Sequence, residues 1–91
     1  MVTAIILINA ARHRVAAVAE ELADFPEITE VYSVAGQYDL VALIRVPHND
    51  GLANLVTQKM PNIDGIERTE SLIAFRAYSR HDLENLFSVG L

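Results

Sequence analysis

The chain has 91 residues, enough for one hydrophobic core but too few for two independent domains, so we expect a single domain over residues 1–91. Its 7 Lys and Arg residues against 12 Asp and Glu residues give a net charge of -5, which repels phosphate groups and argues against direct nucleic-acid binding. The absence of cysteine excludes disulfides, thiolate metal ligands and a catalytic thiol.

The first predicted element is a short strand. Residues Val2 to Ile8 form an apolar run rich in β-branched side chains, which is typical of a strand covered on both faces. The run is far shorter than the ~18 residues of a membrane span, and no basic segment precedes it as in a secretion signal. We therefore expect a cytoplasmic chain with no membrane partner.

A helix and a second strand are predicted next. Between Arg12 and Asp24, apolar side chains recur with helical spacing opposite an acidic face, and Pro26 ends this pattern. From Ile28 to Val34 apolar and polar residues alternate, which predicts a half-exposed strand. The apolar positions of the helix are Val15, Val18, Ala19 and Leu22.

The second half of the chain repeats this order. A hairpin loop leads into a buried strand from Leu40 to Val46, and helical spacing then runs from Leu52 to Met60, where Pro61 ends it. Residues 63–78 are expected to be extended. Ser79 and Asp82 resemble a helix-capping pair, so a short terminal helix with Leu83, Leu86 and Phe87 on one face is also predicted.

The predicted order is βαββαβ, an α+β ferredoxin-like fold with a four-stranded antiparallel sheet and two helices on one face. The first and third strands are the most apolar, so they should lie in the centre of the sheet. The helices can cover only one of its faces. We expect the other face to pack on a second copy, giving a dimer; the alternative is that the segment from Ser79 folds back over it.

No catalytic or metal-binding pattern stands out. His13, His48 and His81 are far apart and have no partner at a metal-ligand spacing, and the acidic residues of the first helix form a solvated face. The sequence has no recognisable nucleophile triad and no glycine-rich phosphate loop. These observations predict no metal, no cofactor and no enzymatic activity.

The hairpin loop from Tyr32 to Asp39 is the one unusual segment. Backbone amides near Ala35, Gly36 and Gln37 could hold a carboxylate, Asp39 could pair with an ammonium group, and Tyr38 could form a wall of the pocket. The residue preferences of a tight turn also explain the composition of the loop, because Gly36 supplies a positive φ and Asp39 caps a turn. On physical grounds alone, turn chemistry is the favoured interpretation.

Two segments resemble the effector-binding half of Lrp/AsnC family regulators, and the likeness runs through nearly the whole chain. One extends from Glu30 to Val41 and contains the motif G-x-Y-D; the other extends from Ile66 to Phe75 and contains T-E-S-L-I, with Ser71 where the family often has Thr. The family's regulators carry an additional N-terminal helix-turn-helix domain. This sequence has no counterpart of that domain, so the resemblance implies a stand-alone ligand-binding and oligomerisation domain.

The resemblance also implies partners and site residues. It implies a sheet-to-sheet dimer, assembly of dimers into a ring such as an octamer or a decamer, and an amino-acid effector held between dimers. Gly36, Gln37, Tyr38 and Asp39 would hold the main-chain groups of the effector, and Thr69 and Ser71 of a neighbouring dimer would line its side-chain end. The expected role is transcription regulation without direct DNA binding, including association with full-length Lrp/AsnC regulators.

Two other functions share the predicted fold. Small dimeric ferredoxin-like enzymes, such as cofactor-free monooxygenases, need an enclosed pocket beside the sheet, and no cluster of His, Trp or Asn residues points to one. A structural oligomerisation module with an empty effector site would share every predicted feature. Binding data are needed to separate that module from an effector sensor.

Overall fold

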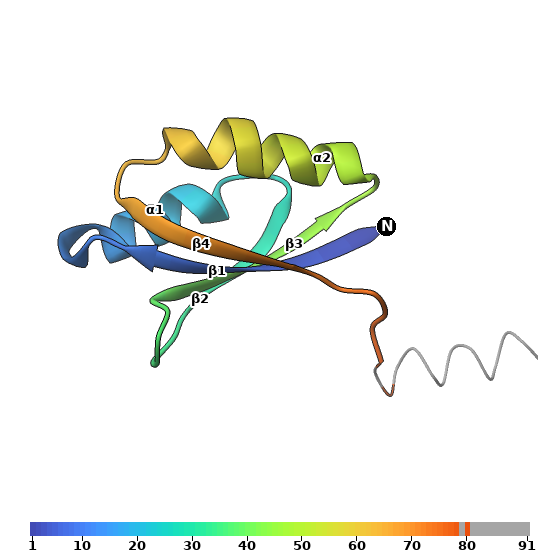
Figure 1. Ribbon diagram of the computed structural model, residues 1–91, viewed down its shortest axis with the longest axis horizontal. Helices are drawn as coiled ribbons and strands as arrows, with labels where there is room; N and C mark the ends of the chain where they lie inside the picture. Colours follow the sequence, from blue (N-terminus) through green and yellow to red (C-terminus); the bar gives the residue numbers. More distant parts are fainter. Residues whose placement is uncertain (79, 81–91) are drawn as a thin grey trace, which may run out of the picture.

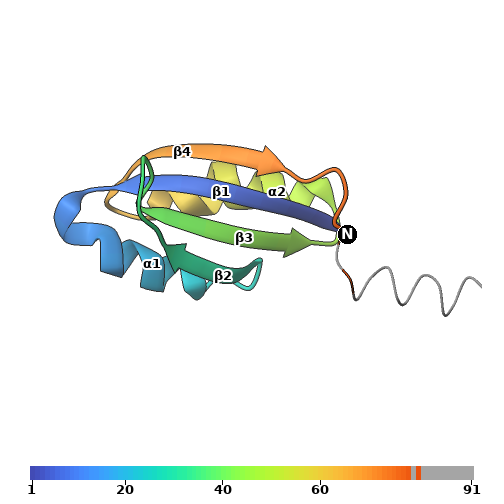
Figure 2. The ribbon, with the colours of Figure 1, turned by 90° about the horizontal axis from the view of Figure 1, so that it is seen from below.

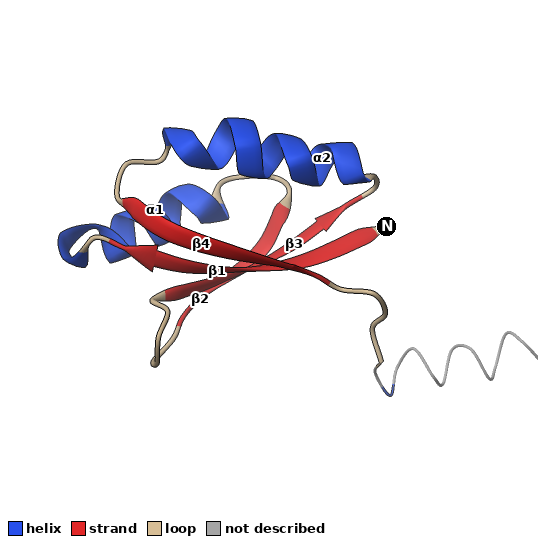
Figure 3. Cartoon of the chain, viewed as in Figure 1, coloured by secondary structure: helices blue, strands red, loops and turns tan. Residues whose placement is uncertain are grey.

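Four antiparallel strands form one sheet, and helical segments pack on one of its sides (Figures 1 and 3). The computed structural model describes residues 1–78 and 80. Strand β1 (Val2–Ala10) leads through a 3₁₀ turn (Arg12–Arg14) into helix α1 (Val15–Ala23). Strands β2 (Ile28–Ser33) and β3 (Leu40–Val46) follow, then helix α2 (Asn49–Asn54), a π-helical turn (Leu55–Lys59), a 3₁₀ turn (Met60–Asn62) and strand β4 (Ile66–Ile73).

The strand order is β2-β3-β1-β4, with every neighbouring pair antiparallel (Figure 2). The apolar strands β1 and β3 lie in the centre and the more polar β2 and β4 lie at the edges. This order confirms the predicted ferredoxin-like topology. Both helices lie on one side of the sheet, as right-handed crossovers require (Figure 1).

The core lies between the sheet and the helices. In β1 and β3 every second side chain is buried, so the two strands present one continuous apolar surface to α1 and α2. Val18 and Leu22 of α1 complete the layer from the helical side, as the sequence spacing predicts. Each of these large side chains contributes about 1.5–3 kcal/mol by burial. The fully buried strand residues include Ile6, Ile8, Leu40 and Ile44.

The opposite side of the sheet carries an apolar patch, here called the open face, that is uncovered in the described part of the chain. Cross-strand pairing joins Ile5 to Leu43 and Leu72, and Leu7 to Val41. Directly opposed residues point to the same face, so these side chains form one patch. The open face comprises Ile5, Leu7, Tyr32, Val41, Leu43 and Leu72, of which Tyr32 and Leu72 are 46% and 45% exposed.

Several predicted boundaries differ from the structure. Strand β4 begins at Ile66 and ends at Ile73, so it is shorter than the predicted extended segment over residues 63–78. The predicted second helix changes to a π-helical turn at Leu55, a rare conformation that spacing alone does not distinguish from an α-helix. The predicted terminal helix after Ser79, and the alternative in which that segment covers the open face, lie outside the described residues.

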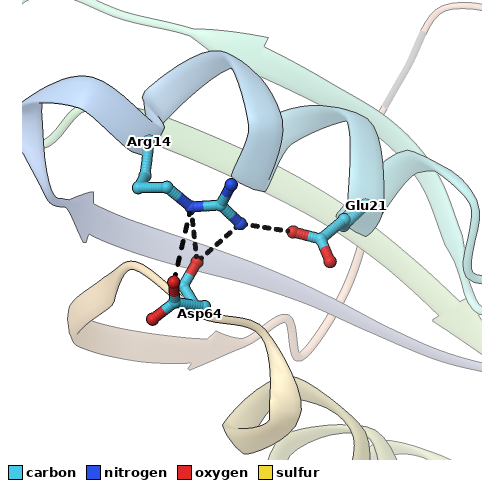
Figure 4. Close-up of polar contacts among 3 residues, drawn as sticks. All are labelled: Arg14, Glu21 and Asp64. Atoms are coloured by element: carbon cyan, nitrogen blue, oxygen red, sulfur yellow. Dashed lines mark hydrogen bonds and ion pairs between the residues drawn. The ribbon is translucent and has the colours of Figure 1, made fainter.

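A close contact joins the start of α1 to the turn before β4. The guanidinium of Arg14 donates hydrogen bonds to the carbonyl oxygen of Asp64 and to Oε2 of Glu21 (Figure 4). The backbone N–H of Ala11 donates to the carbonyl oxygen of Gly65 at 2.8 Å. Gly65 has a φ of +104°, and a Cβ atom placed there would lie 2.6 Å from Cβ of Arg14. The turn therefore requires glycine.

Glu27 and Lys59 form an ion pair between the α1–β2 connection and the π-helical turn. The ammonium of Lys59 also lies 5.7 Å from the ring centre of Phe25. The hydrogen bond from Lys59 lowers the pKa of Glu27, against the opposing effect of burial. Oε1 of Glu27 is buried without a partner in the described part of the chain, so desolvation offsets much of the gain from pairing.

This ion pair predicts an acid-sensitive contribution to stability. Because the folded-state pKa of Glu27 lies below its ordinary value of 4.5, the contribution is present above that pH and is lost as the pH falls through the folded-state pKa. We expect wild type to lose up to about 1 kcal/mol more than Glu27→Gln on acidification below pH 4.5. Urea unfolding across this range would measure it; parallel pH profiles would contradict the assignment.

Candidate functional site

The β2–β3 loop is held closely against the end of β1. The backbone N–H of Val34 donates to the carbonyl oxygen of Asp39 and closes the loop, and Gly36 has a φ of +121° at its tip. The backbone N–H of Asp39 donates to the carbonyl oxygen of Ile8, and Oδ2 of Asp39 accepts from the backbone N–H of Ala10 at 2.9 Å. Figure 1 shows the loop projecting from the sheet on the side away from the helices.

Unused hydrogen-bonding groups gather at the tip of this loop. Within residues 1–78, no hydrogen bond is donated by the backbone N–H of Ala35, Gly36 or Gln37. The carbonyl oxygen of Gln37 instead accepts from Nδ2 of Asn9 at 2.8 Å, which fixes the direction of the loop. Consecutive free amides attract a carboxylate. Within residues 1–78 only Oδ2 of Asp39 accepts a hydrogen bond, so Oδ1 could contact a cation.

Tyr38 connects the loop to β4. Its hydroxyl donates to Oε2 of Glu70 at 2.7 Å, and this bond, with the neighbouring negative charge, raises the pKa of Tyr38. Glu70 pairs across the sheet with Leu7, so it belongs to the same side of the sheet as the open face. Gln37, Tyr38 and Asp39 are thus each tied to a neighbouring strand.

Thr69 and Ser71 lie on the other side of the sheet. They pair with Ile8 and Ile6, whose side chains are buried beneath the helices, so both hydroxyls point toward the helical side of β4. The six predicted site residues therefore separate into two groups within one chain: the loop residues, and the two hydroxyl residues of β4. Within one chain, the two hydroxyl residues and the loop thus lie on opposite sides of the sheet.

Two neighbouring depressions lie between the second helical segment and β4, and each is lined by one of the two hydroxyl residues. The larger part has a volume of about 460 Å³ and includes Ser71 and Ile73 of β4. A smaller depression of about 140 Å³ includes Thr69. Val56, in the π-helical turn, lines both parts, and such turns occur often at functional sites. We call the larger part the α2–β4 groove; its other lining residues are Asn49, Leu52, Ala53, Val56 and Thr57.

Reasoning from the sequence alone missed part of this arrangement. Asn9 and Glu70 contact the loop from distant points of the chain, and only the pairing of β1 with β3 and β4 brings them there. Glu70 stands between Thr69 and Ser71 in the quoted motif, which was the available signal for it. No signal in the sequence identified the helical wall of the groove.

Among residues 1–78 and 80, no group of three or more His, Asp or Glu side chains is arranged to hold a metal ion. No helix in the same part of the chain is both long and apolar enough to cross a membrane.

The comparisons with known proteins point to one family. A family model described as the Lrp/AsnC ligand binding domain matches residues 3–83. The HTH-type transcriptional regulator FL11 of Pyrococcus furiosus is 34% identical over 77 residues, which cover 85% of this chain and 50% of the regulator. The chain thus spans about half the length of the curated relatives that it matches.

Two solved structures support the same grouping. TTHA0845 of Thermus thermophilus is 50% identical, with a TM-score of 0.82, and the match covers 88% of this chain and 100% of that one. AsnC of E. coli is 26% identical, with a TM-score of 0.78, over 84% of this chain and 52% of that one. The matched unit thus makes up the whole of the solved TTHA0845 chain and about half of the solved AsnC chain.

Proposed function

The chain belongs to the Lrp/AsnC ligand-binding domain family, and from this premise we propose that it is an amino-acid sensor whose assembly modulates transcription regulation. It binds a small effector and oligomerises, and it neither contacts DNA directly nor catalyses a reaction. Its partners are other copies of itself and full-length Lrp/AsnC regulators, so the proposal places it in the cytoplasm.

The β2–β3 loop carries the proposal. Its free amides lie close to Asp39, so it offers partners for both ends of a zwitterion. Bonds to Ile8, Ala10, Asn9 and Glu70 hold the loop before any ligand arrives, which lowers the entropy cost of binding. In this proposal Gly36 and Gln37 receive the α-carboxylate, Asp39 receives the α-ammonium group, and Tyr38 walls the pocket.

Oligomerisation completes the proposed site. Because Thr69 and Ser71 lie on the helical side of the sheet, they serve an effector held by the loop of another copy. The open face is the natural first interface, since burying it against a second copy removes six large side chains from water. Dimers formed in this way then contact one another through the loop and the β4 side, closing into a ring such as an octamer or a decamer.

Asp39→Asn should separate binding from folding. The amide oxygen of asparagine can still accept from the N–H of Ala10, so the loop stays anchored, but the negative charge facing the ammonium group is lost. We expect little change in stability and a loss of affinity of about 10- to 100-fold. A thermal-shift panel of the twenty amino acids, followed by calorimetry with those that stabilise wild type, would measure this.

Glu20→Gln, which removes one charge from the exposed surface of α1, is the matched control and should bind like wild type. If no amino acid stabilised wild type at millimolar concentration, the sensing role would be wrong. If one did and Asp39→Asn bound it equally well, the effector would bind elsewhere.

A further inference from the structure

The chain leaves strand β4 as an exposed arm, residues 74–78, which turns to the side of the sheet away from the helices (Figure 1). Phe75 and Tyr78 are 104% and 75% exposed, so neither aromatic ring is covered within the described residues. The guanidinium of Arg76 forms no ion pair in the same part of the chain. A single copy thus presents a cationic group flanked by two uncovered aromatic rings.

A groove on the helical side of the sheet has the opposite charge. It lies between the end of α1 and the helical turns that precede β4, and it has a volume of about 460 Å³. Its apolar lining consists of Phe25 and Ile63, and its charged lining is mainly acidic. We call it the α1 groove; its lining residues are Glu21, Asp24, Phe25, Lys59, Asn62 and Ile63.

The α1 groove has unused hydrogen-bond acceptors. Within the described residues the carboxylate of Asp24 has no hydrogen-bond or ion-pair partner. Nδ2 of Asn62 donates to the carbonyl oxygen of Gln58 at 2.9 Å, which leaves Oδ1 of Asn62 without a donor there. The ammonium of Lys59 is already paired with Glu27. An arginine carries several donors on an apolar stem, so it matches acceptors that lie beside apolar side chains.

We propose that the arm of one copy docks in the α1 groove of another, with Arg76 on the acceptors and a neighbouring aromatic ring against the apolar lining. Charge distinguishes this groove from the sheet side that carries the open face. That side carries Glu30 and Glu70, whose carboxylates accept hydrogen bonds from tyrosine hydroxyls. It also carries Arg45 and Arg68, which repel a cation. The α1 groove, with an unpaired carboxylate, is the better receptor for the arm.

The arm reaches a second copy rather than its own groove. The arm turns to one side of the sheet and the groove lies on the other, which disfavours docking within one copy (Figure 1). The chain has a net charge of -5 and the arm one positive charge, so the arm is attracted to the body of another copy. Because one short arm buries little surface, the contact acts between open-face dimers, where several arms engage together. The inference rests on the dimer of the proposed function and adds the surface that joins dimers.

Exchanging the two charges tests the contact. Arg76→Asp brings a second carboxylate to Asp24, and Asp24→Arg brings a second guanidinium to Arg76. Each variant should therefore raise the concentration needed for assembly beyond the dimer at least about ten-fold. The double variant restores an opposite pair and should recover most of the assembly. Glu20→Arg combined with Arg76→Asp is the matched control, because Glu20 is exposed on α1 and does not line the groove; this pair should not recover it.

Analytical ultracentrifugation of the full chain over a concentration series would measure assembly, and circular dichroism would confirm folding. Asp24 ends α1, where a cation is favourable, so Asp24→Arg should fold like wild type. Single variants that remain dimers while the double variant assembles would support the inference. Unchanged assembly of both single variants, a wild type that never exceeds a dimer, or equal recovery in the control would overturn it while the open-face dimer stood. A monomeric wild type would overturn the dimer and the inference together.

Discussion

If the chain forms dimers through the open face, as proposed above, Leu43→Lys is expected to produce a folded monomer. Leu43 lies opposite Glu30 of β2 and Ile5 of β1, in the middle of the apolar patch. In a single copy the new ammonium group stays in water and can approach Glu30, so the monomer loses little stability. In the dimer the charge would be buried at an apolar interface, at a cost of several kcal/mol.

We expect the dimer dissociation constant to rise at least about 100-fold. Light scattering coupled to size exclusion, over a concentration series, would show a mass near the 10.0 kDa of one chain for Leu43→Lys and twice that or more for wild type. Ala16→Lys adds the same charge on the exposed surface of α1 and should assemble like wild type. Unchanged assembly of Leu43→Lys would place the interface elsewhere on the molecule.

Gly65→Ala is expected to be the most destabilising of the alanine substitutions at Gly36, Gly51 and Gly65. Two costs act together: the backbone φ of +104° is unfavourable for alanine, and the new Cβ atom would lie 2.6 Å from Cβ of Arg14. Because both Cβ atoms are fixed to the backbone, α1 or the turn must move, which strains the hydrogen bonds in Figure 4.

The sum of backbone strain and overpacking is about 2–5 kcal/mol, a large fraction of the stability of a small domain. Gly36→Ala is a useful comparison because Gly36 also has a positive φ, of +121°, but a Cβ atom there meets nothing within 4 Å. It should cost only about 1–2 kcal/mol. Urea unfolding of both variants would measure the difference, and equal losses would mean that the contact with Arg14 relaxes freely.

The fold could be predicted from the sequence because local patterns and topology agreed. The apolar runs predicted two central strands and the spacing of Val15, Val18, Ala19 and Leu22 predicted a helix, and the structure confirms both. The cover predicted for both faces of the central strands is present only on the helical face within the described residues. The π-helical turn at Leu55–Lys59 was not predictable, because Leu52, Leu55, Val56 and Met60 keep the spacing of a regular α-helix.

Less of the candidate site than of the fold could be predicted from the sequence. Gly36 and Asp39 stand out as turn residues, but the roles of Asn9 and Glu70 depend on pairing between strands up to about sixty residues apart in the chain. The period-two alternation of β4 places Thr69 and Ser71 on one side and Glu70 on the other, yet only the buried partners Ile8 and Ile6 identify which side faces the helices. Long-range contacts therefore limited the prediction of the site.

The most direct test of the account is light scattering coupled to size exclusion, performed on the wild-type chain with and without a pool of the twenty amino acids. We expect a dimer or a ring of dimers, and a change in mass or in thermal stability when the pool contains the effector. Omitting amino acids one at a time would then identify it. A chain that stays monomeric at high concentration and does not respond to the pool would contradict both the assembly and the sensing role.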